Sequence, residues 1–191
     1  MLGAGTTNTT LTFGRDADLE LSSLSFAGVL PVGERTLVRA GGGAVLDGTI
    51  QVLGGSGHTF DSGGLAFAGV EHRAGEAGGL TPAIDLSLTL GFTWGKTTGS
   101  NAQQADYRAT DLRAGVLASW PVADRFFPYA AGRVFGGPVT WEIDGAGVTG
   151  SDAHHYQLAV GAGLALGPLV LFVEYAGVGE TGTRAGLGSN W

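Results

Sequence analysis

Apolar and polar residues alternate strictly in residues 83–95. The even positions are all apolar: Ile84, Leu86, Leu88, Leu90, Phe92 and Trp94. The odd positions are Gly, Ser, Thr and Ala, with one carboxylate, Asp85. A period of two predicts a β-strand with one apolar face and one small or polar face. Because the apolar face is bulky and ends in two aromatic rings, this strand is typical of one that meets lipid outside and a narrow polar lumen inside.

Similar segments recur along the chain and none of useful length has a helical period. The expected strands are residues 10–13, 19–30, 36–52, 65–72, 84–94, 107–120, 126–135, 154–166, 169–175 and 183–191. Short turns alternate with long polar connections, which are residues 53–64, 96–106, 142–152 and 179–182. This sorting of short and long connections indicates an outer-membrane barrel with its short turns on the periplasmic side.

The pattern therefore predicts a single all-β domain over residues 1–191. We expect a closed antiparallel up-and-down transmembrane β-barrel of eight to ten strands. Ten strands are favoured, because residues 19–30 lead directly into a short turn and closure then needs a first strand near the N-terminus. Residues 1–18 are expected to hold that short first strand or to form an N-terminal extension.

Composition supports a membrane barrel over a soluble sandwich. The chain has 36 Gly among 191 residues and 14% charged residues, against roughly 25% in soluble domains. No run of about 18 apolar residues could form a membrane helix. A net charge of −7 with ten basic residues provides no basic patch to neutralise phosphates, so no nucleic-acid partner is predicted. Without Cys, disulfides and Cys-based metal sites are excluded, and no cofactor or metal site is predicted.

Residues 1–5 lack the features of a signal peptide. An outer-membrane protein must be exported, so we expect Met1 to be a start placed before a mature sequence, or the beginning of a fragment.

Strand parity places a set of mixed charges inside the barrel: Arg39, Asp47, Asp85, Asp111, Arg113, Arg133 and Glu174. A lumen of low dielectric tolerates charges when they are paired. We therefore expect Glu174 to pair with Arg133 or Arg113. A plug of ion pairs is favoured over a gate or ion path, because barrels of this size are mostly filled by side chains. Parity is ambiguous for residues 65–72, where Leu65 and Phe67 are expected to face lipid and His72 the lumen.

Outward aromatic residues are expected at two levels, as interfacial girdles require. They are Trp94, Trp120, Phe126, Tyr156 and Tyr175. The ten steps from Ile84 to Trp94 span about 25 Å of membrane normal at a tilt of ~40°.

Residues 183–191 alternate and end on an aromatic side chain. This end resembles the C-terminal signal that barrel-assembly machinery reads, with Leu187 at an expected apolar position, Ser189 departing from the pattern, and Trp191 in place of the usual Phe. Residues from about 26 to 191 resemble small outer-membrane barrels of the OmpA/OmpX/OmpW type, mainly through residues 127–132, 156–163 and 172–175. The resemblance implies a bacterial outer-membrane location, contact with outer-membrane lipid, assembly through the C-terminal strand, and a monomer.

The favoured function is a structural, adhesive or narrow-conduit role, with no catalytic residues assigned. One alternative is an outer-membrane hydrolase, either an omptin-like protease or a lipid A-modifying enzyme. Its site would be at the outer rim near Asp152 and His154, with Asp106 and Asp111 as a loosely suitable pair or Ser151 as a nucleophile. His154 and His155 point to opposite faces of a regular strand, so they do not predict a metal site. A second alternative is a soluble small-ligand barrel of the lipocalin kind, which the small polar inner faces disfavour.

Overall fold

The computed structural model describes residues 1–52, 55, 57–122, 125–143 and 146–189. Its strands are β1 (Leu2–Thr12), β2 (Asp16–Pro31), β3 (Thr36–Val52), β4 (Gly57–Gly75), β5 (Ala83–Gly99), β6 (Gln104–Ser119), β7 (Phe126–Gly136), β8 (Val139–Ile143), β9 (Ala146–Asp152), β10 (Tyr156–Leu166), β11 (Leu169–Gly179) and β12 (Thr181–Ser189). The described residues contain no helix long and apolar enough to span a bilayer.

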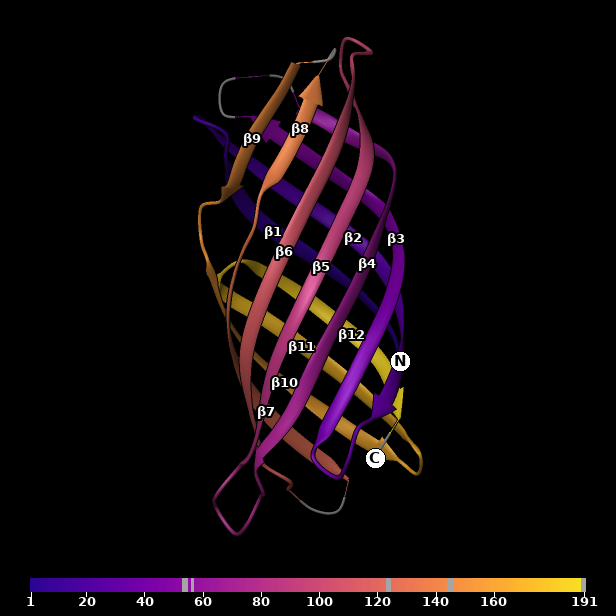
Figure 1. The fold of residues 1–191 in the computed structure, drawn as a ribbon, viewed down its shortest axis with the longest axis vertical. Helices are drawn as coiled ribbons and strands as arrows, with labels where there is room; N and C mark the ends of the chain where they lie inside the picture. The colour runs from indigo at the N-terminus through magenta and orange to yellow at the C-terminus, as the bar shows by residue number, and fades with distance from the viewer. Residues whose placement is uncertain (53–54, 56, 123–124, 144–145, 190–191) are drawn as a thin grey trace.

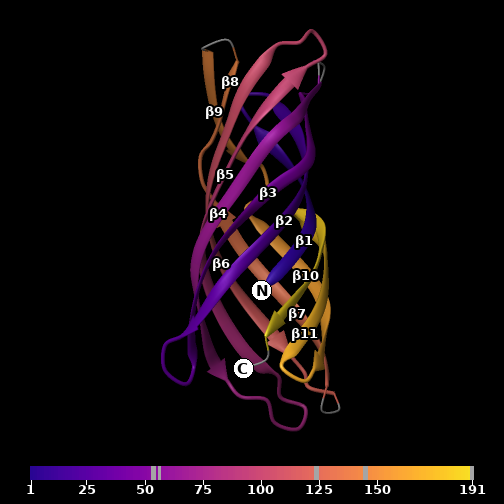
Figure 2. The ribbon, with the colours of Figure 1, turned by 90° about the vertical axis from the view of Figure 1, so that its right-hand side faces the viewer.

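Ten of these strands form one closed antiparallel barrel (Figure 1). The order is β12-β11-β10-β7-β6-β5-β4-β3-β2-β1, and β1 closes the barrel against β12 from Leu2↔Leu187 to Asn8↔Thr181. The expected all-β closed barrel and the preference for ten strands are therefore confirmed. The N-terminus and β12 lie in the lower half of the barrel (Figure 2).

Two further strands extend the wall at the upper end. The β8–β9 hairpin pairs with the upper part of β6, from Ala105↔Ile143 to Ala109↔Val139, and with the end of β1 through Leu11↔Asp152. The β11–β12 hairpin, by contrast, stays in the lower half (Figure 1). The upper wall is therefore built from β1–β6 together with β8 and β9, and the lower wall from ten strands.

The barrel reverses its polarity along its axis, and β6 illustrates the reversal. In the lower part of β6 the outward side chains are apolar, such as Leu112, while Arg113 points into the lumen. In the upper part the outward side chains are polar, such as Arg108, while Tyr107 points inward and is 3% exposed. An apolar outer face suits lipid, whereas a polar outer face around an apolar interior suits water. The lower half thus has the surface of a membrane barrel and the upper half that of a soluble one.

A β-bulge produces the same reversal in β3 without any change in its sequence pattern. Apolar residues continue at even positions from Val38 to Ile50. Leu46 is the extra residue between the pairs Ser23↔Val45 and Ser22↔Asp47. One inserted residue turns all later side chains to the other face. Val38 is therefore exposed on the outside, whereas Ile50 is fully buried inside.

Several expected boundaries are corrected by the structure. The first strand is the eleven-residue β1 rather than a short segment at residues 10–13. Much of the expected loops at residues 53–64, 96–106 and 142–152 belongs to strands β4, β5, β6, β8 and β9. These segments looked like loops because their polar residues face outward into solvent. In β4, Leu65 and Phe67 point inward while Ala66 and Val70 face outward, so the expected orientation was wrong and His72 is exposed outside.

Candidate functional site

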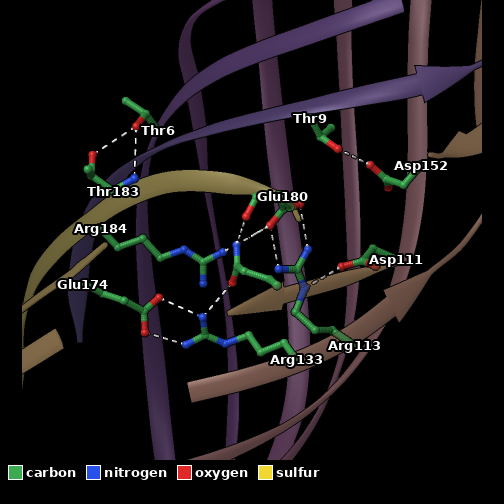
Figure 3. Close-up of polar contacts among 11 residues, drawn as sticks. Thr6, Thr9, Asp111, Arg113, Arg133, Asp152, Glu174, Glu180, Thr183 and Arg184 are labelled. Atoms are coloured by element: carbon green, nitrogen blue, oxygen red, sulfur yellow. Dashed lines mark hydrogen bonds and ion pairs between the residues drawn. The ribbon is translucent and has the colours of Figure 1, made fainter. Parts of the chain in front are cut away.

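A network of ion pairs lies inside the barrel (Figure 3), at the level of the β11–β12 tip near the middle of its length (Figure 1). Arg133 donates two hydrogen bonds to Glu174, at 2.9 and 2.6 Å, and one to Gln157 at 2.7 Å. Arg113 donates two hydrogen bonds to Glu180, at 2.8 and 3.1 Å. Planar guanidinium–carboxylate contacts of this kind combine charge with fixed geometry. Each buried carboxylate is therefore held by an arginine.

Further contacts join the two arginine pairs into one network. The Gln157 amide donates to Glu180 Oε1 at 2.8 Å. Arg184 lies 3.9 Å from the Glu180 carboxylate, and Arg113 Nε donates to Asp111 at 3.1 Å. A buried charge that loses its partner is strongly destabilising. The contacts therefore make this layer of the lumen a fixed plug of charges.

The short β11–β12 turn positions Glu180 in this network. Gly179 has a φ of +77°, which disfavours side chains. A Cβ at Gly179 would also collide with the Tyr156 carbonyl oxygen, and the Glu180 N–H donates to that same oxygen at 3.1 Å. The turn is tight enough to direct Glu180 inward, where it is 5% exposed.

A second group of charges lies toward the lower end of the lumen. Arg73 pairs with Asp85, which is 8% exposed, and lies 3.9 Å from Glu76. Arg39 donates to the Thr89 hydroxyl at 3.0 Å and lies 4.0 Å from Glu71. These pairs fill the lumen below the mid-height network.

An apolar core closes the barrel above the charges. Its buried members are Leu11, Ala17, Leu19, Val45, Ile50, Phe60, Ala105, Tyr107, Val139 and Trp141. The Trp141 indole donates to the Thr97 hydroxyl at 3.2 Å and meets the His58 ring edge-on at 4.8 Å. Close packing, with buried polar groups that have hydrogen-bond partners, is typical of the interior of a folded soluble domain. The lumen thus changes from charged to apolar over its length.

Of the seven charged residues expected in the lumen, six lie on the inner face and one, Asp47, does not. Arg39, Asp85, Asp111, Arg113, Arg133 and Glu174 lie inside with the partners described above. Asp47 does not, because the bulge at Leu46 turns it outward, where it is exposed and accepts a hydrogen bond from the Gly48 N–H at 2.8 Å. The Glu174–Arg133 pair is one of the two pairings expected.

Sequence reasoning missed six members of these clusters: Glu71, Arg73, Glu76, Gln157, Glu180 and Arg184. Strand parity alone would place Gln157 inside without indicating its role. Glu180 fell in an expected loop, and nothing in the alternation marks a turn residue as inward. Arg184 could have been found, because it is the one charged residue in an alternating segment of Thr, Ala, Gly and Leu.

The expected girdle residues all have outward, partly exposed side chains: Trp94, Trp120, Phe126, Tyr156 and Tyr175. Phe92 and Trp94 stack at 5.6 Å with an interplanar angle of 27°. In the expected C-terminal signal, Leu187 also faces outward. Trp191 and Asn190 lie outside the described residues.

The proposed hydrolase residues do not converge in the structure. Asp152 is partly buried and accepts a hydrogen bond from Thr9 at 2.8 Å, whereas His154 is exposed and meets the Tyr156 ring at 6.2 Å. Burial raises the pKa of the Asp152 carboxyl, and the hydrogen bond from Thr9 offsets part of this rise. Among the described residues, no hydrogen bond or ion pair joins Asp152 to His154, and no group of three or more His, Asp or Glu could hold a metal ion.

His154 instead borders a shallow hollow of about 460 Å³ on the outer wall. The tip of the β11–β12 hairpin forms one side, through Gly179 and Thr181, and β1–β3 form the other. Its lining is mostly polar and includes Asp18 and Glu20. The hollow is therefore a mostly polar feature of the wall where the β11–β12 tip meets β1–β3.

Solved structures provide the comparison, since no protein-family model and no curated protein sequence matches the chain. The translocator domain of the autotransporter NalP from Neisseria meningitidis has 15% identity and a TM-score of 0.56, covering 100% of this chain and 88% of its own. The outer-membrane protease OmpT from Escherichia coli has 12% identity and a TM-score of 0.54, covering 100% of this chain and 94% of its own. At these identities the likeness concerns the fold alone. The chain has the fold of an outer-membrane β-barrel.

Proposed function

We propose that the protein is an integral barrel of the bacterial outer membrane with a structural or adhesive role, and that it does not conduct. The filled lumen carries this proposal. The Arg133–Glu174 and Arg113–Glu180 pairs occupy mid-height, and the ten-residue apolar core lies above them. An ion would have to displace fixed charges and then cross an apolar layer, which is costly.

The upper half supports an anchoring and presenting role. Its outer wall carries polar side chains such as Asp18, Glu20 and Thr59, and its interior is packed like that of a soluble domain. The membrane-facing half therefore holds a rigid extension beyond the bilayer, with a polar surface available to other molecules. Under this proposal the β2–β3 turn at Glu34 is periplasmic.

Single cysteines test this placement cleanly, because the chain has none of its own. Thr59→Cys, Leu90→Cys and Glu34→Cys would be labelled on cells with a membrane-impermeant maleimide. We expect labelling of Thr59→Cys on intact cells, of Glu34→Cys after the outer membrane is opened, and of Leu90→Cys in neither case. Labelling of Glu34→Cys on intact cells would overturn the orientation, and labelling of Leu90→Cys would overturn the membrane placement.

Planar-bilayer recording tests the closed lumen. We expect no steady current from the wild-type protein. A persistent open current would contradict the proposed plug and favour a role as a narrow conduit.

The narrower assignments rest on the sequence. The resemblance to the OmpA/OmpX/OmpW type, the monomeric state and recognition of the β12 end by barrel-assembly machinery are part of the proposal. Leu187→Asp supplies a test of the last, because a charge on this outward position should lower the amount of barrel assembled in cells. Unchanged assembly would argue against a signal in β12.

A rim hydrolase is the alternative function. The fold likeness to OmpT supports it, whereas the different environments of Asp152 and His154 oppose it. Cleavage of peptide or ester substrates that is lost in His154→Ala would favour the hydrolase over the structural role.

A further inference from the structure

Two cations stand out on the outer wall of the barrel. Five arginines on the described strands face the lumen: Arg39, Arg73, Arg113, Arg133 and Arg184. Lys96 and Arg108 are the basic residues of the described strands that face outward and are exposed. Five of the seven Lys and Arg residues on the described strands thus lie in the lumen with carboxylate partners, whereas these two lie outside it.

The two cations are neighbours at the edge of the apolar band. Arg108 of β6 is opposite Trp94 of β5, and Lys96 is opposite Asp106. Lys96 and Arg108 are therefore diagonal neighbours, about 7–8 Å apart between Cα atoms, which long side chains can bridge. Trp94 is the last apolar residue on its outward row before Lys96. Both cations consequently lie at the depth where lipid headgroups begin.

The surface just below them is a flat aromatic platform. The Trp94 ring stacks on Phe92 and lies across Gly64, where an added Cβ would come within 2.5 Å of the ring. Such rings favour the boundary between headgroups and acyl chains. The platform and the two cations therefore offer adjacent contacts for the two parts of one lipid.

Neither cation has a protein partner in the part of the chain that the structure describes. No hydrogen bond or ion pair is formed there by Lys96 or Arg108, although each of the five lumen arginines has one. Asp106 is opposite Lys96 in the ladder without forming an ion pair. Two unpaired cations beside a membrane surface attract anionic headgroups.

We propose that Lys96 and Arg108 bind the phosphate of an anionic lipid in the leaflet nearest the upper half of the barrel. The lipid's acyl chains lie along Phe92 and Trp94. This inference rests on the membrane placement proposed above. The guanidinium and the ammonium both donate charge-assisted hydrogen bonds to phosphate oxygens, and the platform fixes the depth of the lipid.

Electron paramagnetic resonance with spin-labelled lipids tests the site. The wild-type protein would be placed in phosphatidylcholine bilayers with either spin-labelled phosphatidylglycerol or spin-labelled phosphatidylcholine. The measured quantity is the ratio of the two association constants in the motionally restricted fraction. We expect the wild type to prefer phosphatidylglycerol. In Lys96→Gln/Arg108→Gln the ratio should fall about fivefold for each charge removed, because a basic residue near an anionic surface contributes about 1 kcal/mol.

Matched variants separate this site from general charge effects. Arg35→Gln/Arg125→Gln removes two exposed cations from the turns at the opposite end and should retain most of the preference. Asp106→Asn removes a negative charge next to the two cations and should raise the preference. An unchanged ratio in Lys96→Gln/Arg108→Gln would overturn the proposal, as would an equal loss in the two double variants.

A second measurement uses the wild-type protein alone. Added salt should reduce its preference for phosphatidylglycerol, because the two cations are exposed, and a preference that does not depend on salt would contradict the site. If the membrane placement itself were wrong, no motionally restricted phosphatidylcholine would be seen, which distinguishes that outcome from failure of the lipid site alone.

Discussion

A charge at the centre of the outer apolar band should be far more costly than the same charge on the upper wall. Leu88→Arg places a cation on the outward row of β5, where Leu88 is 46% exposed. Gln104→Arg is the matched control. Gln104 is an exposed outward residue at the upper end of β6, opposite Thr98 of β5.

The position of Leu88 sets the expected magnitude. It lies four residues from Ile84 and six from Trp94 along β5, which is about 10 Å and about 15 Å along the membrane normal at ~3.3 Å per residue and a tilt of ~40°. An arginine near the bilayer midplane costs about 2–4 kcal/mol, and one near the interface about 0–1 kcal/mol. We therefore expect Leu88→Arg to lower the free energy of unfolding by about 2–4 kcal/mol, and Gln104→Arg to lower it by no more than about 1 kcal/mol.

Urea unfolding in phosphatidylcholine vesicles, followed by tryptophan fluorescence, measures both free energies of unfolding. Migration of heated and unheated samples on a gel confirms that each variant has folded. Equal costs for the two variants would refute the reversal of polarity along the barrel. A larger cost for Gln104→Arg would place the membrane around the upper half instead.

Three further changes probe the interior and the rim by the same unfolding measurement. Glu174→Gln leaves Arg133 without its buried counter-charge and should cost about 3–5 kcal/mol; a loss well below this would mean that the pair is solvated. Ile50→Ala removes a fully buried side chain and should cost about 2–5 kcal/mol, whereas Leu90→Ala on the lipid face should cost clearly less; equal costs would argue against an apolar core in the upper half. Asp152→Asn should be more stable than the wild type at neutral pH, because burial raises the folded-state pKa of this carboxyl and its ionised form is disfavoured. That advantage should vanish as the pH falls below the ordinary pKa of a carboxyl group, and an advantage that persists there would rule out a charge effect.

The alternation of residue types determined much of this protein. It predicted the strands, the closed barrel, the outward aromatic rings and most of the inward charges, because a strand's side chains alternate strictly between its two faces. Arg133 and Glu174 could be placed inside by parity alone, since β7 and β11 have no irregularity between these residues and the aromatic ends of their strands.

Tertiary structure decided where along a strand the even positions switch from the outer to the inner face. In β3 the even positions are apolar or Gly from Val38 to Ile50, and the bulge at Leu46 sends Val38 outward and Ile50 inward. Asp47 was misplaced for this reason. A bulge depends on how a neighbouring strand is paired, and one strand's sequence does not specify that pairing.

The same limit explains the upper half and the centre of the lumen. Polar outward rows such as Gln104 to Arg108 look like loops in isolation, and they form a strand because β5 and β8 pair with them and Trp141 fills the interior behind them. Glu180 belongs to the charge network because a turn across the barrel brings it to Arg113, 67 positions away in the chain. Local alternation therefore fixed which residues share a face, while long-range pairing decided whether that face meets lipid, water or the lumen.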